Sequence, residues 1–107
     1  MEISISAKDF TLTPTIRDHV NDRIEKLMRH RSDLIGAAVV LTVEQHHKKG
    51  EIFLADAIVK IPGNDVFAVV RARDMRRAID LVAEKLERQL IKGKEKKNPR
   101  RRKPLSL

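Results

Sequence analysis

The sequence predicts a single α+β domain in which one four-stranded sheet carries two helices, in the order β-α-β-β-β-α. Three observations lead to this expectation. The chain has 107 residues, the size of one domain. Two long segments repeat apolar residues at helical spacing. Four shorter segments alternate apolar and polar residues or are rich in β-branched side chains, which is typical of strands.

The N-terminal segment predicts a short strand and then a helix. Ile3 and Ile5 alternate with polar neighbours, which indicates a strand. Thr13 and Pro14 fit the N-cap and the first helical position, because threonine can accept a backbone N–H and proline lacks one. We expect the helix over residues 14–30. Its apolar residues at helical spacing are Ile16, Val20, Ile24 and Leu27.

Three consecutive strands are predicted for the middle of the chain, over residues 37–44, 52–61 and 66–72. The turns between them are expected at residues 48–50 (KKG) and 62–65 (PGND), since proline presets one turn position and glycine tolerates positive φ at the next. The residues expected to share a face are Val39, Leu41 and Val43 in one strand, and Phe53, Ala55, Ala57, Val59 and Ile61 in the next. Phe53 and Phe67 are both interpreted as core residues.

A second helix is expected to follow Asp74, which can cap it, and to end near Gly93. Its apolar face would consist of Met75, Ile79, Val82, Leu86 and Leu90. Residues 1–93 are therefore predicted to form one domain. Residues 94–107 are predicted to be a disordered basic tail, because they contain too few apolar residues to build a core.

The charge of the chain predicts a polyanionic partner, with nucleic acid favoured over membrane. The net charge is +8, of which the segment Gly93–Leu107 carries +6, from seven Lys or Arg residues and one Glu. Only three Phe and no Tyr or Trp are present, which argues against a reader of single strands built on base stacking. The chain has no signal peptide and no apolar run long enough to span a membrane, so a cytoplasmic location is expected.

Charged residues of the two helices fall on separate stripes when each helix is projected at about 100° per residue. Basic and histidine residues form one stripe, and acidic residues form another, so we expect the cations to be unpaired. Such cations suit a phosphate backbone, because each one releases a condensed counterion. An ordinary solvated helix face is the alternative interpretation. The basic stripes are His19, Arg23, Lys26 and His30, and Arg77, Lys85, Arg88 and Lys92; the acidic stripes are Asp18, Asp22 and Glu25, and Asp80, Glu84 and Glu87.

The sequence contains no pattern that indicates an enzyme, a metal site or a cofactor. There is no cysteine, no Gly-rich phosphate loop, no HExxH motif and no spacing typical of a Ser-His-Asp triad. His46 and His47 are adjacent near a strand end, where neighbouring side chains point to opposite faces and would not share a metal. We expect a non-enzymatic binding protein.

The second helix resembles that of a known family. It reads DMRRAID over residues 74–80 and KLERQL over residues 85–90. This is similar to the pattern D-M-Y-x-A-I-D…K-L-x-R-Q-L of bacterial ribosome hibernation promoting factors, also called sigma-54 modulation proteins and related to ribosome-associated inhibitor A. The first helix and the strand VVLTVE (residues 39–44) also match that family in spacing. The resemblance covers residues 1–97.

The resemblance implies a fold like that of double-stranded-RNA-binding domains, with both helices on one face of the sheet. It implies binding to rRNA of the small ribosomal subunit, in the channel used by mRNA and by tRNA at the A and P sites. Occupying that channel would reversibly block translation in starvation or stationary phase. The expected rRNA contacts are Arg23, Lys26, Arg77, Lys85, Arg88 and Lys92, with Arg100, Arg101, Arg102 and Lys103 as auxiliary cations in the tail.

The sequence departs from the family pattern in two places. Arg76 stands where the family has an aromatic residue, so a packing or stacking contact is exchanged for a positive charge. The tail is basic, unlike the acidic extension of inhibitor-type members, and is too short for the C-terminal domain by which long hibernation factors pair ribosomes. If ribosome dimers form, the resemblance implies help from the ribosome modulation factor. Off the ribosome, we expect a monomer.

Two other functions stay open at this point. The chain could be a generic double-stranded-RNA-binding or RNA-chaperone module, although the second-helix motif counts against this. It could also be a regulator whose cations meet an acidic protein partner. Stoichiometric binding to small subunits in preference to bulk RNA would distinguish a hibernation factor from both.

Overall fold

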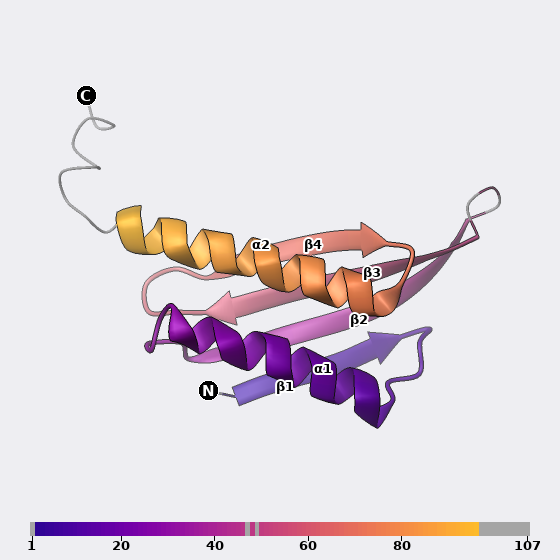
Figure 1. Cartoon of the computed structure of the whole chain (residues 1–107), viewed down its shortest axis with the longest axis horizontal. Helices are drawn as coiled ribbons and strands as arrows, with labels where there is room; N and C mark the ends of the chain where they lie inside the picture. The colour runs from indigo at the N-terminus through magenta and orange to yellow at the C-terminus, as the bar shows by residue number, and fades with distance from the viewer. Residues whose placement is uncertain (1, 47, 49, 97–107) are drawn as a thin grey trace.

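The two helical segments lie side by side on one face of the sheet (Figure 1). The computed structural model describes residues 2–46, 48 and 50–96. The first helix, α1 (Pro14–Glu25), is continued by one 3₁₀ turn, η1 (Lys26–Arg29), and the second helix is α2 (Met75–Lys96). The predicted order β-α-β-β-β-α is confirmed.

Four strands form one mixed sheet in the order β1-β2-β3-β4. The first strand, β1 (Glu2–Lys8), is parallel to β2 (Gly36–His46). This is because α1 returns the chain to the end of the sheet at which β1 begins. The remaining strands, β3 (Gly50–Lys60) and β4 (Val66–Ala72), are antiparallel to their neighbours. The hairpin of β2 and β3 extends past the ends of β1 and β4 (Figure 1).

Both predicted helix caps are present. The hydroxyl of Thr13 accepts a hydrogen bond from the backbone N–H of Ile16 at 3.2 Å. The carboxylate of Asp74 accepts one from the backbone N–H of Arg77 at 3.2 Å. The far end of α2 differs from the expectation, since the helix continues three residues past Gly93. One glycine costs a helix only about 1 kcal/mol, and the residues that follow it are Lys and Glu, which are good helix formers and add little to this cost.

The turn between β3 and β4 also follows the sequence pattern. Gly63 has a φ of +89°, a conformation that favours glycine. The N–H of Asn64 donates to the carbonyl oxygen of Ile61 at 3.3 Å, which closes a tight turn with Pro62 in its first central position. This turn fixes the register in which β4 pairs with β3.

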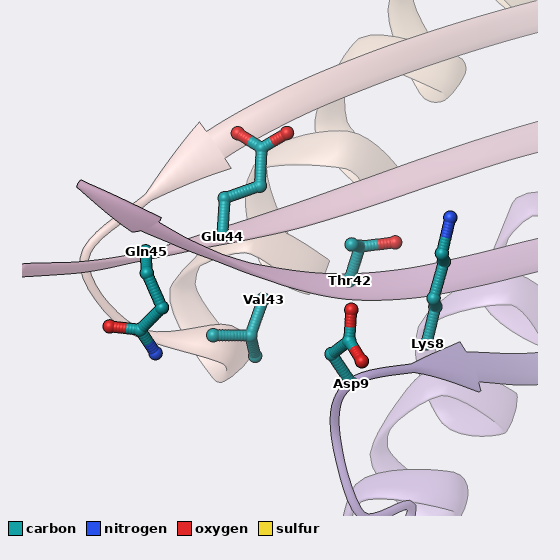
Figure 2. A pocket seen from close by; sticks show the side chains of 6 residues that line it. All are labelled: Lys8, Asp9, Thr42, Val43, Glu44 and Gln45. Atoms are coloured by element: carbon teal, nitrogen blue, oxygen red, sulfur yellow. The ribbon is translucent and has the colours of Figure 1, made fainter.

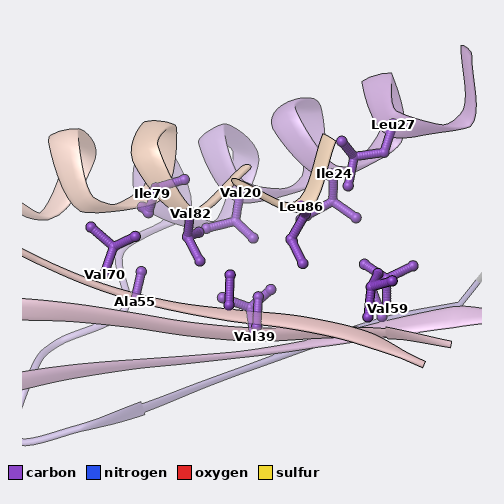
Figure 3. Close-up of a cluster of buried hydrophobic side chains, with 14 of the residues drawn as sticks. Val20, Ile24, Leu27, Val39, Ala55, Val59, Val70, Ile79, Val82 and Leu86 are labelled. Atoms are coloured by element: carbon purple, nitrogen blue, oxygen red, sulfur yellow. The ribbon is translucent and has the colours of Figure 1, made fainter. Parts of the chain in front are cut away.

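Between the sheet and the helices lies the hydrophobic core (Figure 3). The helices contribute the apolar residues that helical spacing predicted, and the strands contribute every second residue. Fully burying one such aliphatic side chain stabilises the fold by roughly 1.5–3 kcal/mol. The largest side chains that are almost fully buried are Val20, Ile24, Val39, Leu41, Val59, Ile79, Val82, Leu86 and Leu90.

The expectation that both Phe53 and Phe67 belong to the core is wrong for Phe67, whose exposed fraction is 66%. Strand β4 buries Val66, Ala68 and Val70 under α2, and strand alternation therefore turns Phe67 to the opposite face of the sheet. Phe53 is half-buried and packs edge-to-face on Phe10, with ring centroids 6.5 Å apart. No described helix covers the face that exposes Phe67.

Candidate nucleic-acid interface

Four predicted contact residues form a row of free cations along the outer side of α2. Each of these side chains is exposed, and none makes an ion pair with a carboxylate in the part of the chain that the structure describes. We call this row the α2 ridge; its members are Arg77, Lys85, Arg88 and Lys92. Their spacing of eight, three and four residues keeps them on one helical face. A surface hollow of about 440 Å³ lies beside the last three, with Gln89 and Ile91.

The basic stripe of α1 is arranged differently, because it faces the acidic stripe of α2. His19 Nε2 lies 2.7 Å from Oδ1 of Asp80. Arg23 Nε lies 3.5 Å from the same oxygen, and Arg23 Nη2 donates to the main-chain oxygen of Asp80 at 3.3 Å. One carboxylate of α2 therefore holds two side chains of α1.

A similar contact joins the end of η1 to α2. His30 Nε2 lies 2.8 Å from Oε2 of Glu87. Lys26 pairs within its own helical segment, with its Nζ 3.2 Å from Oδ2 of Asp22. The expectation of unpaired cations is thus wrong for the first helix. Projecting each helix alone separates its charges, but the fold brings the basic stripe of one helix against the acidic stripe of the other.

Between the two helices runs a groove of about 220 Å³. Arg23, Lys26 and Arg29 bring three cations to it, against the single carboxylate of Glu87. Leu27, His30 and Ala83 complete its lining. The sequence interpretation missed Arg29; its place three residues after Lys26, one helical turn, is the signal that could have found it. The α2 ridge and this groove lie on the helix side of the molecule, away from the open sheet face.

A larger hollow, of about 700 Å³, lies where β1 ends and β2 continues (Figure 2). Lys8, Thr42 and Glu44 line it from one face of the sheet. Asp9, which follows β1, has a φ of 57° and turns the chain away from the sheet. Because the hollow combines one lysine with two carboxylates, it does not favour phosphate over other ligands.

Several expectations concern residues outside this interface. None of the described helices is both long and apolar enough to cross a membrane. Within the described ranges, no cluster of three or more His, Asp or Glu residues could hold a metal ion.

Arg31 is buried and forms a two-bond ion pair with Asp33 in the loop before β2, so it supports the fold rather than the interface. The auxiliary cations Arg100, Arg101, Arg102 and Lys103 and the side chains of His46 and His47 lie outside the described residues.

Together, the mixed sheet, the two helices on one face and the cations of the outer helix define a small α+β domain with a basic helix side. The chain belongs to the family described as Sigma 54 modulation protein / S30EA ribosomal protein, which matches residues 3–98. This confirms the resemblance found in the second-helix motif. It also confirms that the chain is a binding protein and not an enzyme, since the family consists of ribosome-associated factors.

Curated relatives and solved structures agree with this assignment. The chain is 40% identical over 96 residues to the ribosome hibernation promoting factor of Azotobacter vinelandii, covering 90% of this chain and 85% of that one. It is 36% identical to the ribosome-associated factor Y of Haemophilus influenzae, covering 94% and 90%. The N-terminal domain of Thermus thermophilus Protein Y aligns with a TM-score of 0.73 and 28% identity, covering 86% and 98%. A ribosomal subunit interface protein from Coxiella burnetii shares the fold, with a TM-score of 0.79 over 89% of this chain and 99% of that one, at 24% identity.

Proposed function

We propose that this chain is a cytoplasmic ribosome hibernation factor that binds rRNA of the small subunit and reversibly blocks translation in starvation or stationary phase. Membership of the family and the names of the curated relatives support the hibernation role. The channel for mRNA and for tRNA at the A and P sites is the proposed place of binding. A protein that occupies this channel inhibits by exclusion, so it needs no catalytic group.

The α2 ridge is the observation that carries the proposal. The four cations are exposed on one helical face, and none forms an ion pair with a described carboxylate. Each can therefore approach a phosphate and release its counterion. Arg23 and Lys26 lie across the interhelical groove and extend the same basic side of the molecule. We therefore propose that the α2 ridge makes the main phosphate contacts and that the two α1 residues add to them.

The proposal extends to the partners and to the tail. Off the ribosome the chain is a monomer, and on the ribosome the modulation factor would supply the contacts for ribosome pairing. We propose residues 1–93 as the rRNA-binding domain and residues 94–107 as an auxiliary basic segment. Its charge attracts the protein to rRNA over a distance of about one Debye length, roughly 8–10 Å at physiological salt.

Cosedimentation with purified small subunits tests the proposal. The variant Lys85→Glu/Arg88→Glu reverses two cations of the α2 ridge, and Lys8→Glu/Lys60→Glu reverses two exposed lysines of the open sheet face. Both variants lower the net charge from +8 to +4, so any general electrostatic effect is matched. We expect the ridge variant to bind at least about tenfold more weakly than the sheet variant, because contacts to charged groups are lost.

Three results would contradict the proposal. Equal weakening by the two variants would show that net charge, and not the α2 ridge, determines binding. Equal affinity of the wild-type protein for small subunits and for bulk double-stranded RNA would favour a generic RNA-binding module. Failure to bind either RNA, together with binding to an acidic protein, would favour the third candidate, a protein-interaction regulator.

A further inference from the structure

An acidic residue, Asp80, lies on the basic side of the molecule, between the two helices. Its side chain is about one-third exposed, with an exposed fraction of 35%. By charge alone, a carboxylate at this place would repel the phosphates that the surrounding cations attract. Its contacts suggest what it does instead.

Asp80 is the only described carboxylate that contacts two basic side chains of α1. His19 Nε2 lies 2.7 Å from Oδ1, and Arg23 Nε lies 3.5 Å from the same oxygen. The main-chain oxygen of Asp80 also accepts a hydrogen bond from Arg23 Nη2 at 3.3 Å. Arg23 is thus held along one edge of its guanidinium group, the edge that carries Nε and Nη2.

The opposite amino group of Arg23 is left for another partner. Nε is buried and forms no hydrogen bond in the described structure, so its closeness to Asp80 is electrostatic. No described residue bonds Nη1, and the side chain lines the interhelical groove together with Lys26 and Arg29. An arginine fixed in this way loses less side-chain freedom when it binds a phosphate than one that moves freely in solvent.

We propose that Asp80 is a positioning residue: it holds Arg23 against α2 so that the guanidinium group faces a phosphate in the interhelical groove. This inference rests on the proposed binding to rRNA. It assigns Asp80, an acidic residue that the charge pattern set apart from the binding stripe, to the binding machinery. His19 contacts the same carboxylate and keeps it between the two helices.

A matched pair of substitutions on α2 tests the proposal. If Asp80 only repels phosphates, its removal should strengthen binding to small subunits; if it positions Arg23, its removal should weaken that binding. Asp80→Ala and Glu84→Ala each remove one negative charge from the same helix. Glu84 is exposed, and no described residue pairs with it. We expect Glu84→Ala to bind small subunits as tightly as wild type or more tightly, and Asp80→Ala to bind about tenfold more weakly, since one charge-assisted contact is lost.

The salt dependence of binding gives a second measurement. If Asp80 only stabilised the fold, its removal would leave this salt dependence unchanged. Losing one phosphate contact should lower the slope of log K against log salt by about 0.7–0.9 for Asp80→Ala and not for Glu84→Ala. In an Arg23→Ala background, the further change Asp80→Ala should no longer weaken binding. Asp80→Asn keeps one acceptor oxygen in the same place, and we expect it to lose less affinity than Asp80→Ala.

Thermal unfolding of each variant shows whether it is folded under the binding conditions. If Asp80→Ala is not folded under these conditions, Asp80→Asn replaces it in the binding experiment. Tighter binding by both Asp80→Ala and Glu84→Ala would overturn the positioning role and leave the proposed function standing. The same would follow if Asp80→Ala weakened binding equally with and without Arg23. Absence of small-subunit binding by the wild-type protein would instead overturn the proposed function, and the positioning role with it.

Discussion

His30, the residue that follows η1, and Glu87 of α2 are 57 residues apart in the chain, and their side chains meet at 2.8 Å between Nε2 and Oε2. Together with the 2.7 Å contact of His19 and Asp80, this pair fixes the two helical segments to each other at two separate places. The apolar residues Val20 and Ile24 pack against α2 in the same interface. The groove and the α2 ridge therefore belong to one packed helix pair.

The His30–Glu87 contact should contribute modestly to stability. Both side chains are about one-third to one-half exposed, so solvent screens the pair. We expect His30→Ala to lower the free energy of unfolding by about 0.2–1 kcal/mol in chemical denaturation. A double-mutant cycle with Glu87→Ala should show that the two losses are not additive. Additive losses would mean that the interaction between the two side chains contributes nothing to the free energy of unfolding.

The core makes a much larger contribution. Leu86 is fully buried in α2, whereas Ile91, five residues further along, has an exposed fraction of 39%. We expect Leu86→Ala to cost about 2–5 kcal/mol, because it leaves a cavity between helix and sheet. Ile91→Ala should stay within about 0.5 kcal/mol of wild type. Similar losses in the two variants, measured by urea unfolding, would be incompatible with the packing described for α2.

Inhibition by exclusion predicts a stoichiometric effect on translation. In a cell-free extract, protein synthesis should fall in proportion to the added protein and reach its plateau near one copy per ribosome. An excess of initiation components should restore synthesis, since they compete for the same channel. Strong inhibition at far below one copy per ribosome would require catalytic turnover and would contradict the proposed mechanism.

Removing residues 97–107, the part of the basic tail that comes after α2, distinguishes the contribution of charge to binding from the choice of binding site. A chain truncated after Lys96 keeps all of α2 and loses the five cations of residues 97–107. We expect a flatter salt dependence and slower association with small subunits, because fewer counterions are released. The rRNA protected in a footprint should not change. A footprint that moves or vanishes at low salt would show that the tail, rather than the helix side, determines the site.

Most of the fold follows from local patterns in the sequence. Helical spacing and strand alternation predicted the order of the elements, and the caps at Thr13 and Asp74 follow from side-chain chemistry. Strand alternation could not decide which face of β4 is buried, because both faces carry apolar residues. Val66, Val70 and Phe67 all fit a core strand, and only the position of α2 over β4 turns Phe67 outward.

Only part of the site could be predicted from local patterns in the sequence. The residues of the α2 ridge could be found because one helix alone determines that they share a face. The α2 partners of His19, Arg23 and His30 could not, since they depend on which side of α1 packs against α2. His19 and Asp80 are 61 residues apart, and no local pattern relates them. The pairing of Arg23 emerges only when the two helices are placed side by side.

Directed cleavage of rRNA tests the central claim most directly, namely that the helix side of the molecule faces the rRNA. The chain contains no cysteine, so single cysteines can be introduced by Glu84→Cys on α2 and Phe67→Cys on the open sheet face, both at exposed positions, and each can carry a tethered iron chelate. On small subunits, we predict strong cleavage of channel rRNA from position 84 and weak cleavage from position 67. Stronger cleavage from position 67, or cleavage outside the mRNA and tRNA channel, would contradict the claim.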